Sequence, residues 1–438
     1  MNIVVDFTKP FVLIFVIGTF LSLFLNHFLE YIDYRARVKN GNQLPSELLE
    51  IPLAKQTFES EKLAKIVEYE NAKYFAWIPS SICTFILEFV LIIFGYYPFI
   101  LQILTDWIGI PSTIGKSFCV FSLFSIFASL PNMILSIPFD LYEEFHVEKK
   151  FGFSNMNFKL WITDKLKSLI LGLILRGFLV FIASVLFIKF SLSWWWIFGI
   201  VLVGLTFIMQ VVYPKFIAPL FNKFSPLEDG ELKDKISEVL KKCGFKNDGL
   251  FVMDASKRSG HSNAYFSGFG KSKRIVLYDT LLKSMTSDEL VAVLGHELGH
   301  YKLHHITKKI CFLIPMEFVL MFALFSLSQI PSLYSGFGFS GINAENVIFF
   351  QYIGLFLASA LYDSVSEILS PIVNFSSRKD EFQADAFSKK ICGTSEYLVN
   401  GLIKLNAENL SEILPPKLYV IWNFSHPTLV ERIKALRK

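Results

Sequence analysis

Long apolar runs alternate with charged segments along this chain. A helix needs about 20 apolar residues to cross a bilayer, and seven runs are of that order: 10–29, 75–101, 117–139, 168–188, 192–213, 310–330 and 346–371. Only Lys189 to Ser191 lie between the fourth run and the fifth, so these two are expected to form a tight helical hairpin. The pattern predicts a mainly α-helical integral membrane protein with seven spans.

The polar segments between the runs divide the chain further. Segment 214–309 is long enough for a small soluble domain, and its pattern predicts a helix after Asp229 and short strands near 250–253 and 274–278. We therefore expect four regions: an N-terminal membrane region with five spans (1–213), a domain outside the membrane (214–309), spans six and seven (310–371), and a C-terminal part of the same domain (372–438).

Lysine and arginine are distributed unevenly between the two sides that this topology defines. Cytosolic loops of membrane proteins carry an excess of these residues. Segments 30–74, 140–167 and 376–438 together hold 22 of them, whereas the loops on the opposite side hold 3. The N-terminus is therefore expected outside and the C-terminus in the cytosol. The membrane would be the cytoplasmic membrane in a bacterium and the endoplasmic reticulum in a eukaryote.

Composition supports a membrane protein and excludes other classes. The 438 residues are 53% hydrophobic with 18% charged residues, against roughly 25% charged in soluble domains. The net charge of +4 is small and most basic residues flank apolar runs, which indicates membrane topology and argues against a nucleic-acid partner. Five widely spaced cysteines without a Cys-x-x-Cys pair argue against a disulfide framework or a cysteine-bound zinc.

The chemistry is concentrated in segment 286–305, TSDELVAVLGHELGHYKLHH, which predicts one helix. It contains His-Glu-x-x-His at His296, Glu297 and His300. Residues i and i+4 share one face of a helix, so both imidazoles can reach one metal ion while Glu297 projects toward a water on it. This arrangement is typical of zinc metalloproteases.

A catalytic zinc needs a third protein ligand. His304 lies eight residues after His296, about 12 Å along a helix, which is too far for one ion, so His304 and His305 are expected at the surface or in a supporting position. Glu381 is a better candidate, because Asp385 follows it at i+4. One of these carboxylates can bind zinc while the other accepts the free N–H of a ligating histidine.

This sequence resembles the type I CAAX prenyl proteases in seven segments that occur in the same order. These proteases are integral-membrane zinc metalloproteases of the gluzincin group. The matching segments cover nearly the whole chain: 139–142, 148–155, 214–230, 254–268, 296–300, 378–385 and 425–427. The resemblance implies seven helices that enclose a hydrated chamber, closed by a cytosol-facing protease domain with a small β-sheet. It also implies one zinc ion per chain.

The resemblance assigns roles to single residues. It implies that His296, His300 and Glu381 bind zinc and that Glu297 is the general base. The corresponding Asp385 is sometimes described as a proton donor, although its spacing favours a hydrogen bond to a ligand histidine. It further implies that His426 lies near the scissile carbonyl. Substrate would bind along an edge strand at Asn263 and Ala264, and Arg378 is a further candidate for contact with the oxyanion.

Three functions remain open at this point. The first is an endopeptidase, expected to be monomeric, that cuts near the C-terminus of CAAX-type prenylated or hydrophobic peptides. The second is a membrane-protein quality-control protease with the same catalytic residues. The third is a transporter or binding protein with a vestigial zinc site, which charged residues inside the apolar runs would suit. For these residues we expect a wet interior position, with Glu88 or Glu317 paired to Arg176 as one hypothesis.

Overall fold

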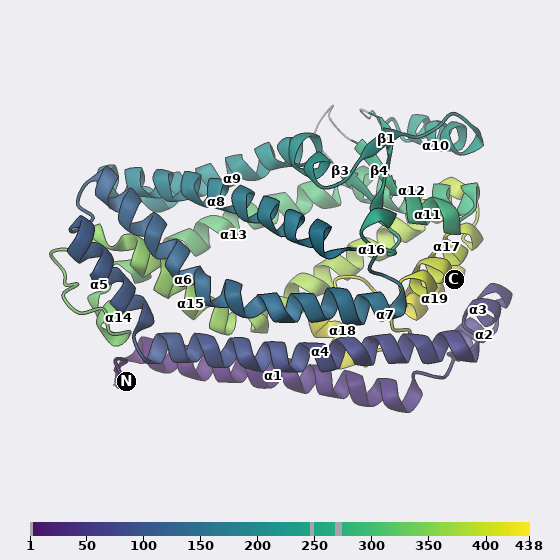
Figure 1. Ribbon diagram of the computed structural model, residues 1–438. Coiled ribbons are helices and arrows are strands. Elements are labelled where there is room, and N and C mark those ends of the chain that lie inside the picture. The colour runs from purple at the N-terminus through teal and green to yellow at the C-terminus, as the bar shows by residue number, and fades with distance from the viewer. Residues whose placement is uncertain (1–2, 246–248, 268–273) are drawn as a thin grey trace.

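The membrane part consists of long helices that run side by side (Figure 1). The computed structural model describes residues 3–245, 249–267 and 274–438. Within these residues, seven helical stretches are long and apolar enough to cross a membrane. They comprise α1 (Pro10–Asn40), α4 (Ser60–Ile93), α6 (Ile114–Tyr142), α8 (Phe158–Lys189), α9 (Trp194–Val212), α13 (His305–Ser328), and α15 (Gln351–Ser366) followed closely by α16 (Ser370–Cys392). The prediction of a mainly helical protein with seven spans is confirmed.

The second apolar run is not one helix, which corrects the predicted span 75–101. Helix α4 begins at Ser60, so the charged segment before this run and its apolar first part form one continuous helix that ends at Ile93. Gly95 then adopts a left-handed conformation with φ 74°, which glycine tolerates because it has no Cβ. The chain turns there into a separate short helix, α5 (Tyr96–Ile108).

The helices surround a cavity of about 760 Å³. Glu88 lines it and accepts a hydrogen bond from Asn132 at 3.1 Å, while Arg176 donates to the Ser129 hydroxyl at 2.8 Å. In the part of the chain that the structure describes, no ion pair joins Arg176 to Glu88 or Glu317, so the hypothesis of that pairing is not supported. Glu88 and Arg176 thus both line this interior cavity, whereas Glu317 is not among its lining residues.

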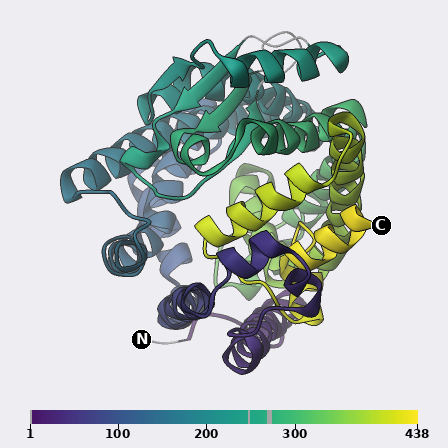
Figure 2. The same cartoon turned by 90° about the vertical axis from the view of Figure 1, so that its right-hand side faces the viewer.

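A four-stranded sheet lies at one end of the molecule, which Figure 2 shows facing the viewer. Its order is β1 (Phe224–Pro226), β2 (Leu250–Met253), β4 (Arg274–Tyr278) and β3 (Ala264–Ser267). Strands β2 and β4 are parallel, whereas β1 and β3 pair antiparallel with them. The two strands expected from the sequence are confirmed as β2 and β4, and β3 occupies one edge of the sheet.

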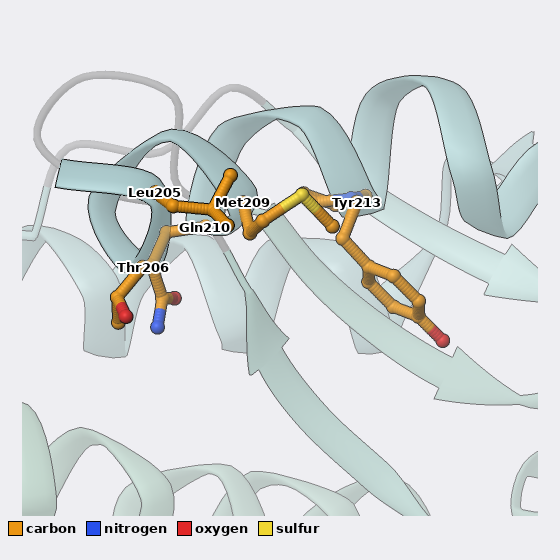
Figure 3. Close-up of a pocket in the computed structure, with 6 residues that line it drawn as sticks. Leu205, Thr206, Met209, Gln210 and Tyr213 are labelled. Carbon is orange, nitrogen blue, oxygen red and sulfur yellow. The ribbon is translucent and has the colours of Figure 1, made fainter. Parts of the chain in front are cut away.

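A shallow hollow of about 430 Å³ marks the end of the fifth span beside this sheet. Figure 3 shows its lining side chains projecting from one helical segment, and these residues are Leu205, Thr206, Met209, Gln210, Tyr213 and Pro214. The Arg274 guanidinium of β4 lies 3.5 Å from the Pro214 carbonyl oxygen. This hydrogen bond joins the end of the fifth span to the sheet.

The part of the molecule outside the membrane spans is built around α12 (Ser287–Lys302), which packs along α16. Thr286 and Glu289 form the predicted capping box at its start. Its hydrophobic core also contains residues from α4 and from the small helices α2 (Ser46–Leu49) and α3 (Pro52–Thr57). The first part of the chain therefore helps to support the helix that carries His-Glu-x-x-His.

Gly299 sets how closely α12 approaches α16. A Cβ at this position would lie 2.9 Å from the Ala384 Cα and 3.1 Å from its carbonyl oxygen. Gly299→Ala should gain up to about 1 kcal/mol in helix propensity, but overpacking against backbone atoms costs about 1–3 kcal/mol. We expect a net loss of stability, seen as a lower midpoint of thermal unfolding in detergent.

Gly172 on α8 provides the matched control, because a Cβ there would meet nothing within 4 Å. Gly172→Ala should leave the unfolding midpoint unchanged or raise it. Equal midpoints for both variants would show that α12 and α16 do not depend on the small residue at their contact.

Candidate metal centre

Two histidines of α12 point their ring nitrogens toward each other. His296 and His300 are one helical turn apart, and their Nε2 atoms lie 3.2 Å from each other. The ring centroids are 4.9 Å apart. The i, i+4 spacing of His-Glu-x-x-His thus brings two potential metal ligands to one point, as the sequence pattern requires.

Glu381 reaches the same point from α16. Its Oε2 lies 3.3 Å from His296 Nε2, and its Oε1 lies 3.2 Å from His300 Nε2. Glu381 is only 4% exposed, and its Oε2 makes no hydrogen bond of acceptable geometry. A buried carboxylate oxygen without a partner is costly, so this atom indicates a site built for a cation.

The spacing of these atoms fits zinc. Tetrahedral zinc binds imidazole nitrogen and carboxylate oxygen at about 2.0–2.2 Å, which places neighbouring ligand atoms about 3.4 Å apart. One ligand atom from each of His296, His300 and Glu381 can be chosen such that all lie within 4.8 Å of one another. The donor set of two imidazoles and one carboxylate is also that of catalytic zinc sites, which keep a fourth position open.

Asp385 supports the first histidine. Its Oδ1 lies 2.7 Å from His296 Nδ1, and since a carboxylate only accepts, the proton of the neutral ring is on Nδ1 and the Nε2 lone pair faces the cluster. Arg432 of α19 (Leu429–Arg437) holds Asp385 with two hydrogen bonds of 2.6 and 2.9 Å. This ion pair neutralises the buried carboxylate and fixes its orientation.

Glu297 lies beside the ligands on α12. Burial raises the pKa of its carboxyl, and the neighbouring His296 and His300 counteract this only in part. A carboxylate with a raised pKa is a better proton acceptor near neutral pH than an exposed one. The environment of Glu297 therefore suits a general base.

His426 approaches from the loop after α18 (Lys417–Asn423). Its Nε2 lies 3.4 Å from Glu381 Oε1, and its Nδ1 is 2.9 Å from the Ser425 hydroxyl. The side chain is 62% exposed, so it faces the open side of the cluster. His426 is the most exposed of the predicted catalytic residues, so a substrate can reach it from the open side.

Two comparisons with known families cover almost the whole chain. Residues 226–438 match the model of peptidase family M48, and residues 33–223 match the model of the CAAX prenyl protease N-terminal region with five membrane helices. The chain belongs to peptidase family M48. The prediction of a membrane metalloprotease is thereby confirmed.

Individual relatives of this M48 protein agree with the family match. It is 35% identical to CAAX prenyl protease 1 of Saccharomyces cerevisiae, over 93% of this chain and 92% of the relative. It is 30% identical to a human CAAX prenyl protease 1 homolog, over 91% and 90% of the two chains. The crystal structure of S. mikatae Ste24p superposes with a TM-score of 0.85 at 35% identity, covering 98% and 99% of the two chains.

The predicted substrate-binding residues of this M48 protein lie in two places. Ala264 is the first residue of the edge strand β3, which packs beside α12. Asn263 is exposed, and its side-chain oxygen accepts a hydrogen bond from the Ala264 amide at 2.8 Å. The structure thus places these two residues at the start of a strand that borders the helix carrying His296 and His300.

Arg378 is not brought into the ligand cluster. Its guanidinium donates to the carbonyl oxygens of Phe424 at 2.6 Å and Val420 at 3.1 Å. Carbonyls at a helix end lack partners within the helix, so the end of α18 attracts this cation. Arg378 therefore holds the turn before His426, and the expectation of a direct contact with the oxyanion finds no support in this geometry.

Sequence reasoning missed Arg432 and left His305 undecided. Arg432 lies far along the chain from Asp385, the residue to which it donates, and no spacing rule connects the two. Of the two histidines after His300, His304 is exposed whereas His305 is buried with its Nδ1 3.1 Å from His300 Nδ1. Burial of only one of two adjacent histidines depends on the turn between helices, which the sequence does not reveal.

Proposed function

We propose that this chain is a zinc-dependent endopeptidase that cleaves peptide bonds near the C-terminus of CAAX-type prenylated or hydrophobic peptides. The observation that carries the proposal is the convergence of His296, His300 and Glu381 beside the half-buried Glu297. The substrate class is supported by relatives named CAAX prenyl proteases, which cover nine-tenths of the chain.

The proposed mechanism divides the work among the residues of the site. A zinc ion held by His296, His300 and Glu381 would supply a Lewis acid that polarises the scissile carbonyl and acidifies water. Glu297 accepts the proton of the attacking water and passes it to the leaving amine. His426 donates a hydrogen bond to the developing oxyanion from the open side.

The supporting residues keep this arrangement in place. Asp385 fixes the ring of His296 rather than donating a proton to substrate, because its two oxygens are occupied by His296 and Arg432. Edge strand β3, beginning at Ala264, offers its backbone to an extended peptide, since an added strand can pair with an exposed edge. Such pairing would lay the substrate along α12.

We further propose one zinc ion per monomeric chain and a catalytic face in the cytosol. The excess of lysine and arginine on that side supports this orientation, with the N-terminus outside and the C-terminus inside. In a eukaryotic cell the membrane would be the endoplasmic reticulum, and in a bacterium the cytoplasmic membrane. A catalytic site on the cytosolic face would encounter its substrates soon after they are prenylated.

The proposed activity can be tested on a farnesylated CAAX peptide and its unprenylated twin. Wild type and Glu297→Ala are purified in detergent and assayed with and without a zinc chelator. Chelator-sensitive cleavage by the wild type alone establishes the protease, and preference for the farnesylated peptide establishes the prenyl role. Equal cleavage of both peptides would favour the quality-control alternative, and no cleavage by zinc-loaded wild type would count against the proposal.

The retention of zinc should depend on pH through His296. Burial acts to lower the pKa of His296, but its interactions with Asp385 and Glu381 outweigh burial and raise it. Imidazole binds zinc only in its neutral form, so a raised pKa lets protons compete at a higher pH. We expect the zinc affinity to fall as the pH decreases, and to begin to fall at a higher pH than it would with an unperturbed histidine.

This pH dependence is measured as the zinc content after dialysis at stepped pH. Asp385→Asn is the informative comparison, because it removes the interaction that raises the pKa of His296. The same dependence of zinc affinity on pH in the wild type and in Asp385→Asn would contradict the expectation.

A further inference from the structure

The turn between α12 and α13 has an unusual backbone. Helix α12 ends at Lys302, and α13 already begins at His305. His304 joins them in the left-handed conformation with φ 58° and ψ 31°, which costs a non-glycine residue roughly 1–2 kcal/mol. The tight turn directs the exposed His304 outward and His305 back toward α12.

His305 is one of the most buried polar residues of the protease part, with 1% of its surface exposed. Its Nδ1 lies 3.1 Å from His300 Nδ1, and its Nε2 lies 3.2 Å from Gln383 Oε1. The Asp380 Oδ1 is also 3.7 Å from the same Nε2. One ring nitrogen of His305 therefore faces a metal-ligand candidate, and the other faces two acceptor oxygens of α16.

These contacts determine where the protons lie. Since Gln383 Oε1 and Asp380 Oδ1 are acceptors, the neutral His305 ring carries its proton on Nε2 and its Nδ1 is an acceptor. His300 must then carry its proton on Nδ1 and donate it to His305. The Nε2 lone pair of His300 is left facing Glu381 and His296.

Without a cation between them, the facing Nε2 atoms of His296 and His300 would repel each other. The same reasoning puts the His296 proton on Nδ1, against Asp385. Two unprotonated nitrogens then face each other across 3.2 Å, next to the carboxylate of Glu381. Such an arrangement of acceptors is stable only around a cation, which ties the role of His305 to the metal.

We propose that His305 is a positioning residue that holds His300 in its Nδ1–H tautomer and aims the His300 Nε2 at the metal. This inference rests on the proposed zinc site. His296 and His300 are thus fixed in different ways, the first by a carboxylate that is paired with Arg432, the second by a neutral histidine and Gln383. The difference leaves Glu381 as the ligand that supplies negative charge to the metal.

Three substitutions of His305 test whether its Nδ1 acceptor, rather than the rest of the ring, positions His300. His305→Asn keeps an acceptor oxygen near the place of Nδ1, His305→Gln moves the amide to the place of Nε2, and His305→Leu removes both. Loss of a residue that orients a metal ligand typically costs 10- to 100-fold in metal affinity. We expect a loss of this size, about 10- to 100-fold, in His305→Leu and His305→Gln, and zinc binding close to wild type in His305→Asn.

The measurement is the zinc affinity of the full-length protein in detergent, determined by competition with a chelating dye. His304→Asn is the matched control, because asparagine tolerates the left-handed conformation and the side chain is exposed. It should bind zinc like the wild type. Thermal unfolding without zinc shows whether each variant is folded.

The outcomes distinguish this inference from the proposed function. If the wild type binds zinc and folded His305→Leu binds it equally tightly, the inference is overturned while the zinc site stands. Equal weakening in folded His305→Asn and His305→Leu also overturns it, because an acceptor would then not be what matters. Absence of zinc from the wild type would overturn the zinc site and this inference together.

Gln383 provides an independent test if substitutions of the buried His305 fail to fold. Gln383→Glu keeps an acceptor for His305 Nε2–H, whereas Gln383→Leu removes it. We expect weaker zinc binding in Gln383→Leu and wild-type binding in Gln383→Glu. Equal affinities in these two variants would overturn the inference, because the proton on His305 would then not depend on its partner in α16.

Discussion

Replacing Glu297 with glutamine is expected to abolish peptide cleavage while zinc remains bound. Glutamine has nearly the same shape but cannot accept the proton of the attacking water. A positioned acid or base contributes about 10²- to 10⁴-fold to a rate, so the turnover number should fall by at least this factor. Glu297 is not one of the three residues whose ligand atoms converge, and the zinc content should therefore stay near one per chain.

The measurement combines a peptide cleavage assay with metal analysis of the same preparation. Glu297 interacts electrostatically with His296 and His300. Removing its negative charge therefore also tests whether this charge contributes to metal binding. Full activity in a folded, zinc-loaded Glu297→Gln variant would exclude the role of general base. Loss of zinc from the variant would instead show that Glu297 contributes to metal binding.

Replacing Glu381 with alanine is expected to empty the metal centre. The carboxylate contacts both ring nitrogens at 3.2 and 3.3 Å, and it is the acidic member of the proposed ligand set. Its loss should weaken zinc binding by more than the roughly 10- to 100-fold typical of a supporting residue. Cleavage should disappear with the metal, in contrast to Glu297→Gln, in which the metal stays.

Glu408→Ala serves as the control, because this glutamate is exposed at the end of α17 (Glu396–Glu408) in the same part of the protein. It should retain both zinc and activity. A Glu381→Ala variant that binds zinc as tightly as this control would show that the third ligand is another residue.

The membrane part could be predicted because its physical cause is local. Each apolar run is long enough to span a bilayer by itself, so length and composition alone locate the helices. The prediction was wrong where a single residue decides the structure. Gly95 ends one helix and starts another within the second run, whereas α4 continues upstream through a charged segment because its amphipathic face packs in the protease core.

The candidate ligands could also be proposed from spacing, since one helical turn joins His296 to His300 and another joins Glu381 to Asp385. The supporting contacts could not be predicted in the same way. Arg432 and His305 reach the site through the packing of α19 and the turn at His304. Such contacts between distant segments follow from tertiary structure, for which a single sequence contains no periodic signal.

The placement of the ligands also has a consequence for biogenesis. His296 and His300 precede the sixth span, whereas Glu381 follows the seventh. During translation the two histidines emerge from the ribosome while their third partner has not yet been synthesised. The centre can assemble only after the sixth and seventh spans have inserted as a hairpin, which returns α16 to the side of α12. A nascent chain therefore lacks the complete set of three candidate ligands until both of these spans have been made.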